Sequence, residues 1–210
     1  SWSLLTDGKN GIPRDHFVRV VREDPERKGL LYAGTEFGVY VSFDDGARWQ
    51  PLQLNLPVTP VTDLAVKRGD LVVATQGRAF WILDDLSPLR QMSAAAERSD
   101  AHLFEPRATY RLPGGGMNFD GDPVGKNPPS GAVIWFDLAA EPEDEVRLEF
   151  LDGEGALLRE LSSVTEEPRA PNPWERFMPP DALPGRKLEV KQGLNRYVWN
   201  LRLHDAELLD

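Results

Sequence analysis

Hydrophobic and polar residues alternate in short runs along most of this chain, a pattern typical of half-buried β-strands. In the first ninety residues these runs are rich in β-branched and aromatic residues and are separated by Gly, Asp and Pro. The pattern predicts strands at 17–21, 30–33, 39–41, 49–52, 62–66, 71–76 and 80–85. Further strands are expected at 132–138, 145–151, 157–161, 187–190 and 196–202, after a loop rich in Gly and Pro. We therefore expect an all-β protein.

The first half of the chain contains an internal repeat of about 40 residues. Leu31-Tyr32-Ala33-Gly34-Thr35 matches Leu71-Val72-Val73-Ala74-Thr75, and Trp2-Ser3-Leu4-Leu5 matches Trp49-Gln50-Pro51-Leu52. Four short strands in a repeat of this length are typical of a β-propeller blade. Residues 1–90 are then expected to hold the end of one blade, one complete blade and a final blade that has lost part of its pattern.

The most distinctive motif is the run from Ser42 to Trp49, which reads Ser-x-Asp-x-Gly-x-x-Trp. A tight turn is expected here because Asp accepts hydrogen bonds from nearby backbone N–H groups and Gly adopts positive φ. The alternative is a metal-binding or catalytic aspartate pair, but no His or further ligand lies nearby in the sequence. We interpret Ser42, Asp44, Gly46 and Trp49 as structural residues of the turn.

Composition narrows the classes of function. The formal net charge is -10 and no basic cluster is present, so nucleic-acid binding is not expected. The chain contains no cysteine and three histidines, without metal-ligand spacing, and we expect neither a metal nor a cofactor. No apolar run is long enough to span a bilayer. No Gly-x-Ser-x-Gly nucleophile motif occurs either.

The pattern changes near residue 90. Ser87 followed by Pro88 is typical of a helix N-cap, which predicts a short helix over 89–96 that leads into a linker at 91–102. Residues 103–210 then read as a small β-sandwich of hairpins, possessing a turn at Asp152-Gly153-Glu154-Gly155. The glycines at 114–116 suggest a phosphate-binding loop, but the Gly-Lys-Ser/Thr signature and the strand–loop–helix context are missing.

Several motifs are shared with one family. The run 42–49 resembles the Asp-box of BNR-repeat β-propellers, which occur in sialidases, sortilin-like receptors and some glycoside hydrolases. The run 73–85 resembles the last blade of bacterial exported proteins labelled sortilin-like or BNR-repeat glycosyl hydrolases. The runs 127–132 and 193–202 resemble the Ig-like, flagellar-hook-capping-type sandwich that follows that propeller. Two positions depart from the family: Arg48 replaces Thr or Ser, and Gln76 replaces the His of many relatives.

The resemblance implies an exported, periplasmic or secreted protein that is active on carbohydrates, with the sandwich as a non-catalytic module. It also implies that ligands bind where the loops between the second and third strands of each blade meet the loops that lead into the first strands. The candidate ligand-binding residues there are Arg14, Asp15, Glu36, Gln76 and Arg78. Glu36 is the candidate catalytic acid or base; alternatively, it forms a salt bridge with Arg78 between neighbouring blades.

Two functions therefore stay open. A glycoside hydrolase needs two carboxylates across a cleft. A non-enzymatic scaffold would instead bind a glycan, a peptide or a protein, and the aromatic run 174–177 is then either a docking surface or a flap over the sandwich. Two blades cannot close a ring, so we infer that the chain is part of a longer protein. Remaining blades, a partner chain or a swapped copy are expected to cover the open edges.

Overall fold

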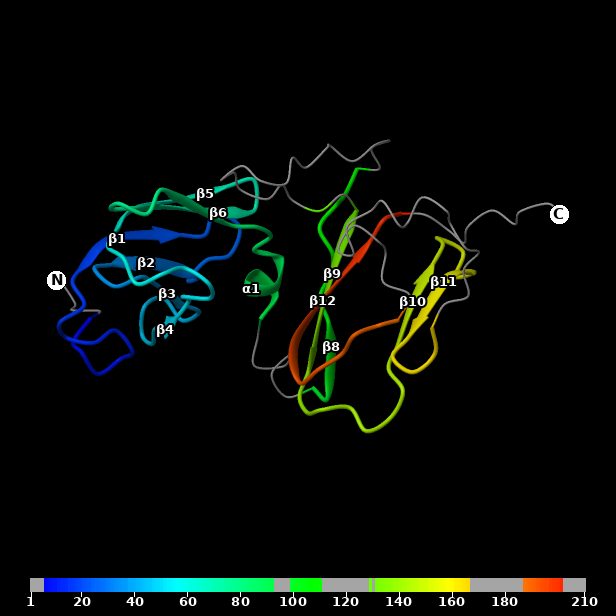
Figure 1. Cartoon of the computed structure of the whole chain (residues 1–210). Helices are drawn as coiled ribbons and strands as arrows, with labels where there is room; N and C mark the ends of the chain where they lie inside the picture. The colour runs from blue at the N-terminus through cyan, green and yellow to red at the C-terminus, as the bar shows by residue number, and fades with distance from the viewer. Residues whose placement is uncertain (1–5, 93–98, 111–128, 130, 167–186, 202–210) are drawn as a thin grey trace. The chain divides into compact units, whose positions relative to one another are not determined.

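The computed structural model describes residues 6–92, 99–110, 129, 131–166 and 187–201. These residues form antiparallel sheets with one short helix, which confirms the all-β class (Figure 1). The chain divides into two compact units, Ser1–Arg90 and Gln91–Asp210. Each unit has its own hydrophobic core.

The first sheet contains four strands in the order in which they occur along the chain. They are β1 (Val18–Glu23), β2 (Leu31–Thr35), β3 (Val39–Ser42) and β4 (Gln50–Pro51). Every neighbouring pair is antiparallel. Such a meander needs only short turns between strands, which explains why Gly, Asp and Pro separate the apolar runs of the sequence.

The second sheet repeats the first with three strands, β5 (Val61–Lys67), β6 (Asp70–Thr75) and β7 (Phe80–Leu83). Thr35 lies opposite Val18 and Thr75 lies opposite Val61, and in both pairs the register shifts directly after this point. Both threonines also close their hairpins in the same way, since the backbone N–H and the hydroxyl donate to one carbonyl, that of Gly38 or that of Ala79. The repeat in the sequence thus corresponds to the same pattern of hydrogen bonds in the two sheets.

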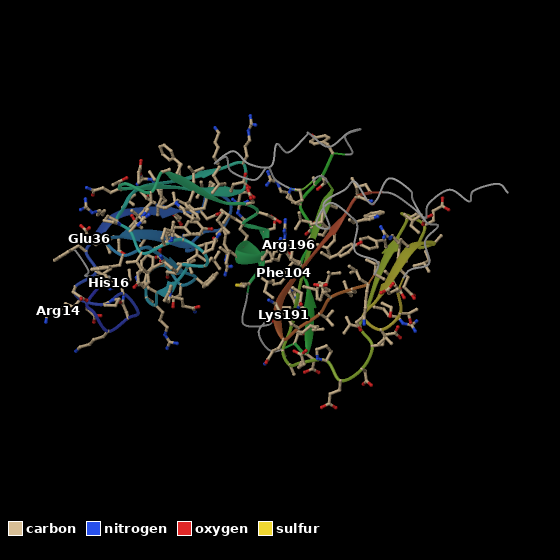
Figure 2. All side chains as sticks on the ribbon, viewed as in Figure 1. Arg14, His16, Glu36, Phe104, Lys191 and Arg196 are labelled. Carbon is tan, nitrogen blue, oxygen red and sulfur yellow. The ribbon has the colours of Figure 1, made fainter. Side chains whose placement is uncertain are left out.

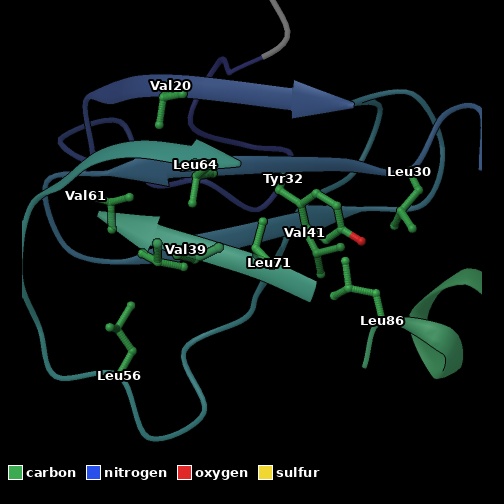
Figure 3. Packing of buried hydrophobic residues seen from close by; sticks show 11 residues of the cluster. Val20, Leu30, Tyr32, Val39, Val41, Leu56, Val61, Leu64, Leu71 and Leu86 are labelled. Carbon is green, nitrogen blue, oxygen red and sulfur yellow. The ribbon is translucent and has the colours of Figure 1, made fainter. Parts of the chain in front are cut away.

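The two sheets stack face to face around the core of the first unit (Figure 3). Strand alternation sends one set of side chains from each sheet into this core. The set comprises Val20, Tyr32, Val39 and Val41 from the first sheet and Val61, Leu64, Leu71 and Val73 from the second. Gly34 permits the close approach, because a Cβ atom there would lie 2.6 Å from Cγ1 of Val61.

The far face of the first sheet is covered by the segment that precedes β1. Ile12, from this segment, packs with Leu31, Ala33, Tyr40 and Trp49 in a second cluster. The segment lies so close that a Cβ atom on Gly11 would sit 1.8 Å from the backbone oxygen of Trp49. The central strands β2 and β3 are therefore buried on both faces.

The helix α1 (Ser87–Gln91) begins two residues earlier than predicted, and residues 93–96 of the predicted helix lie outside the described residues. The prediction of Ser87 as the N-cap was wrong, because Ser87 is already helical and Leu86 accepts the first helical hydrogen bond, from the Arg90 N–H at 3.0 Å. The side-chain acceptor at the helix start is instead the carboxylate of Asp85, which accepts from the Ser87 N–H at 3.1 Å. The residue that positions the helix start thus lies two positions before the expected one.

The described residues of the second unit form a three-stranded sheet and a hairpin that share one core. The sheet runs in the order β12 (Gly193–Trp199), β9 (Ala132–Leu138), β8 (Ala101–Leu103), and the hairpin is β10 (Arg147–Leu151) with β11 (Leu157–Ser162). Their core side chains include Ile134, Phe136, Leu148, Phe150, Leu161 and Tyr197. The carboxylate of Asp152 closes the predicted hairpin turn by accepting from the N–H groups of Glu154 and Ala156.

Some boundaries of the second unit differ from the prediction. Residues 187–190 do not form a strand; instead Leu188 donates its N–H to the Ser162 oxygen at 2.9 Å and inserts its side chain into the core. The last strand begins at Gly193 rather than at Arg196, and β8 begins inside the predicted linker. The glycine loop 114–116 and the aromatic run 174–177 lie outside the described residues.

Candidate functional site

The turn after β3 is a closed network of short-range hydrogen bonds. Asp44 Oδ1 accepts from the Arg48 N–H at 2.8 Å and from the Ser42 hydroxyl at 2.9 Å. The Ser42 oxygen in turn accepts from the Gly46 N–H at 2.9 Å. Since residue 48 contributes only its backbone N–H to this network, the turn tolerates the arginine side chain at this position. With its carboxylate engaged in the loop, Asp44 stabilises a turn, and the candidate site lies elsewhere.

The predicted ligand-binding residues lie at one end of the two stacked sheets. Arg14 and Asp15 belong to the segment that leads into β1, and Glu36 lies in the β2–β3 hairpin (Figure 2). Gln76 and Arg78 lie in the equivalent β6–β7 hairpin. Each hairpin is hydrogen-bonded to the segment before the first strand of its own sheet. The Glu36 N–H donates to the backbone oxygen of Phe17, and the Gln76 N–H donates to the backbone oxygen of Pro60. In each sheet, the hairpin loop thus lies beside the segment that leads into the first strand.

An aromatic cluster occupies this end of the first sheet. The ring of His16 stacks on that of Phe37 with centroids 4.3 Å apart and an interplanar angle of 29°. The Tyr40 hydroxyl lies 2.8 Å from His16 Nδ1. Burial raises the pKa of the Tyr40 phenol, and the negative charge of Asp15 raises it further. The phenol therefore stays protonated, and when it donates to Nδ1 the neutral imidazole carries its own proton on Nε2.

Glu36 is held by a guanidinium, and the predicted salt bridge to Arg78 was wrong. Arg19 on β1 donates from Nε to Glu36 Oε1 at 2.7 Å and also forms an ion pair with this oxygen through Nη2. Arg78 instead uses its backbone oxygen to accept from Trp81 Nε1 at 2.8 Å. Arg19, rather than Arg78, reaches Glu36 because β1 pairs with β2, the strand that leads into the hairpin holding Glu36.

Sequence reasoning missed two of the residues that define this site. Tyr40 reads as an ordinary strand residue, and Arg19 as an exposed charge on β1. The only signal in the sequence is their position close to the ends of predicted strands. Their partners lie 24 and 17 residues away and become neighbours only when the first sheet has formed.

The site offers an aromatic surface surrounded by charged groups of both signs. Phe37 is 42% exposed, so one side of the His16–Phe37 stack is available to a ligand. Arg14 and Asp15 are exposed beside it. Among the residues that the structure describes, no three His, Cys, Asp or Glu side chains are grouped to hold a metal ion. The described helix is too short and polar to cross a membrane.

Comparisons with protein-family models, with curated proteins and with solved structures gave no match for this chain. Inferences about its function therefore rest on the residues and their geometry.

Proposed function

We propose that this protein binds a carbohydrate chain at the end of its stacked sheets and does not hydrolyse it. The observation that carries the proposal is the partly exposed ring of Phe37, which is backed by His16 and flanked by Arg14 and Asp15. A rigid apolar surface with a few polar groups at its rim suits sugars, whose rings have an apolar face and a hydroxyl edge.

The pairing of Glu36 favours binding over hydrolysis. A glycosidase requires one carboxylic acid that is protonated and a second carboxylate placed across the scissile bond. A guanidinium at hydrogen-bond distance occupies one of the Glu36 oxygens. The remaining oxygen suits acceptance of a hydrogen bond from a ligand hydroxyl.

The proposal includes the architecture and location that the family resemblance implies. In support of a propeller, the first unit contains a four-stranded meander, and the second sheet repeats its first three strands with the same register. In support of an Ig-like accessory module, the second unit places a three-stranded sheet and a hairpin around one core. An exported location rests on the resemblance alone.

Titration calorimetry of the chain against a panel of soluble polysaccharides tests this function. The variant Phe37→Ala should weaken binding of any accepted polysaccharide at least tenfold, whereas Tyr110→Ala, which removes an exposed ring from the second unit, should leave it unchanged. Release of reducing ends should stay at background with every polysaccharide. Equal binding by the wild-type chain and Phe37→Ala would contradict the proposal, and so would turnover that Glu36→Gln abolishes.

A second candidate ligand is a peptide. Phe17 is a large apolar side chain that is exposed beside Arg14 and Asp15, and such a combination also suits an extended polypeptide. Screening the same chain against a random peptide library separates the two ligands. A peptide whose binding depends on Phe17 but not on Phe37 would favour the second candidate.

A further inference from the structure

Over the described residues, the second repeat has one strand fewer than the first and ends at β7. In the first sheet, β4 pairs with β3 by placing Pro51 opposite Tyr40 and Gln50 opposite Val41. The register against the preceding strand identifies Trp81 and Ile82 as the equivalents of Tyr40 and Val41. Among the described residues, β7 is the last strand of its sheet. A free edge of this kind can accept an extended segment.

A hollow lies beside β7 at the position that Trp49 fills in the first repeat. Trp49 packs against Leu31, Ala33 and Tyr40. The equivalents of these three residues by register are Leu71, Val73 and Trp81, and they line a cavity of about 50 Å³ together with Leu52 and neighbouring residues. At about 10–15 Å³ for each water, the cavity has room for roughly four waters, on the order of one large apolar side chain.

Within the part of the chain that the structure describes, no sheet covers the outer face of the second sheet (Val72, Ala74, Phe80, Ile82). By register Phe80 and Ile82 correspond to Val39 and Val41, which are 2% and 3% exposed because the second sheet covers them. Phe80 and Ile82 are 76% and 59% exposed. If another sheet of the same kind packed on the second sheet as the second sheet packs on the first, it would cover this face.

We propose that a second copy of this chain completes the second sheet with its first five residues. The segment Trp2-Ser3-Leu4-Leu5 matches Trp49-Gln50-Pro51-Leu52, which includes β4. In the register of β4 it pairs antiparallel to β7 with Ser3 opposite Ile82 and Leu4 opposite Trp81. Trp2 then enters the hollow.

The order of elements along the chain supports this assignment. After β4 the chain leads directly into the sheet that covers the first sheet, and after residue 5 it leads into β1 of the first sheet. A docked segment would therefore deliver the first sheet of its own copy to the outer face of the second sheet. Within one copy, the segment that follows residue 5 packs through Ile12 on the face of the first sheet that is turned away from the second sheet.

The resulting contact is head-to-tail, because residues 1–5 and β7 are different surfaces of the chain. Such contacts form rings where the rotation closes and open chains where it does not. Two copies would bring four sheets together, a number found in the smallest propellers. The inference concerns assembly and is independent of the ligand at the end of the sheets.

Sedimentation velocity and light scattering of the full chain over a range of concentrations test the proposal. We expect association to species that are multiples of 23.5 kDa. Trp2→Ala and Ile82→Lys should each raise the dissociation constant at least tenfold, whereas Val58→Lys, at an exposed apolar position in the loop between the two sheets, should not. Far-UV circular dichroism verifies that each variant is folded.

A synthetic peptide of residues 1–8 gives an independent measurement. In excess it should compete for β7 and dissociate the assembly, and the same peptide with Trp2→Ala should not. A monomer at all concentrations would overturn the proposal. Association that neither Trp2→Ala nor Ile82→Lys weakens would overturn it equally.

Discussion

Stability of the first unit should depend strongly on one buried carboxylate, that of Asp24. Asp24 follows β1 and is 3% exposed. Its oxygens accept from Arg90 Nε at 3.0 and 3.1 Å, and from the backbone N–H groups of Glu26 and Arg27 at 2.9 and 3.0 Å. Tyr32 donates its hydroxyl at 3.3 Å. Burial raises the pKa of the Tyr32 phenol, and the Asp24 charge raises it further, so this donor remains protonated.

Replacement of Asp24 by Ala should cost about 3 kcal/mol. Removing one partner of a buried ion pair typically costs about 3–5 kcal/mol, because the other charge stays buried without compensation. Arg90 keeps a bond to Glu26 at 2.8 Å, which places the expected cost at the lower end of this range. For a domain of this size, each 1 kcal/mol lowers the melting temperature by about 4–8 °C, so a fall of at least about 12 °C is expected.

Urea unfolding, monitored by hydrogen exchange of peptides from β1–β3, measures the change in the free energy of unfolding of the first unit alone. Asp63→Ala is the matched control, because Asp63 forms an exposed ion pair with Arg22 at 2.7 Å, and such pairs contribute at most about 1 kcal/mol. A double-mutant cycle with Arg90→Met should give a coupling of about 2 kcal/mol. Equal costs for Asp24→Ala and Asp63→Ala, or a coupling near zero, would refute the reasoning.

Three further predictions concern packing, backbone strain and pH. Trp49→Ala should destabilise the first unit by about 3–5 kcal/mol in chemical unfolding, because it empties the cluster on the far face of the first sheet. Gly11→Ala should lower the melting temperature far more than Gly77→Ala: both glycines have positive φ, but only Gly11 lies against another backbone. Hydrogen bonds from Ser162 and a neighbouring guanidinium lower the pKa of Glu145 below its ordinary 4.5. Its contribution is present above pH 4.5 and is lost as the pH falls through the folded value, so Glu145→Gln should flatten the acid limb of the stability profile.

Local patterns in the sequence were sufficient to predict the strands of the first unit, their repeat and the turn at Ser42–Trp49. Strand alternation and turn chemistry act over a few residues, so the sequence itself carries them. Asp44 and Ser42 find their hydrogen-bond partners within four residues. Loops at equivalent positions of a repeat also fall at the same end of their sheets, and Glu36 and Gln76 lie in such loops.

Contacts between distant residues were decided only by the tertiary structure. Glu36 pairs with Arg19 instead of Arg78, and Asp24 binds Arg90 across 66 positions of the chain. In the second unit, Leu188 completes the core without belonging to a strand. No periodicity encodes such pairings, because they depend on which strands and loops lie side by side after the chain has folded. The sequence by itself thus determined the strands and turns of the first unit, whereas the pairing of strands in its first sheet determined the charge pair and the aromatic cluster of the candidate site.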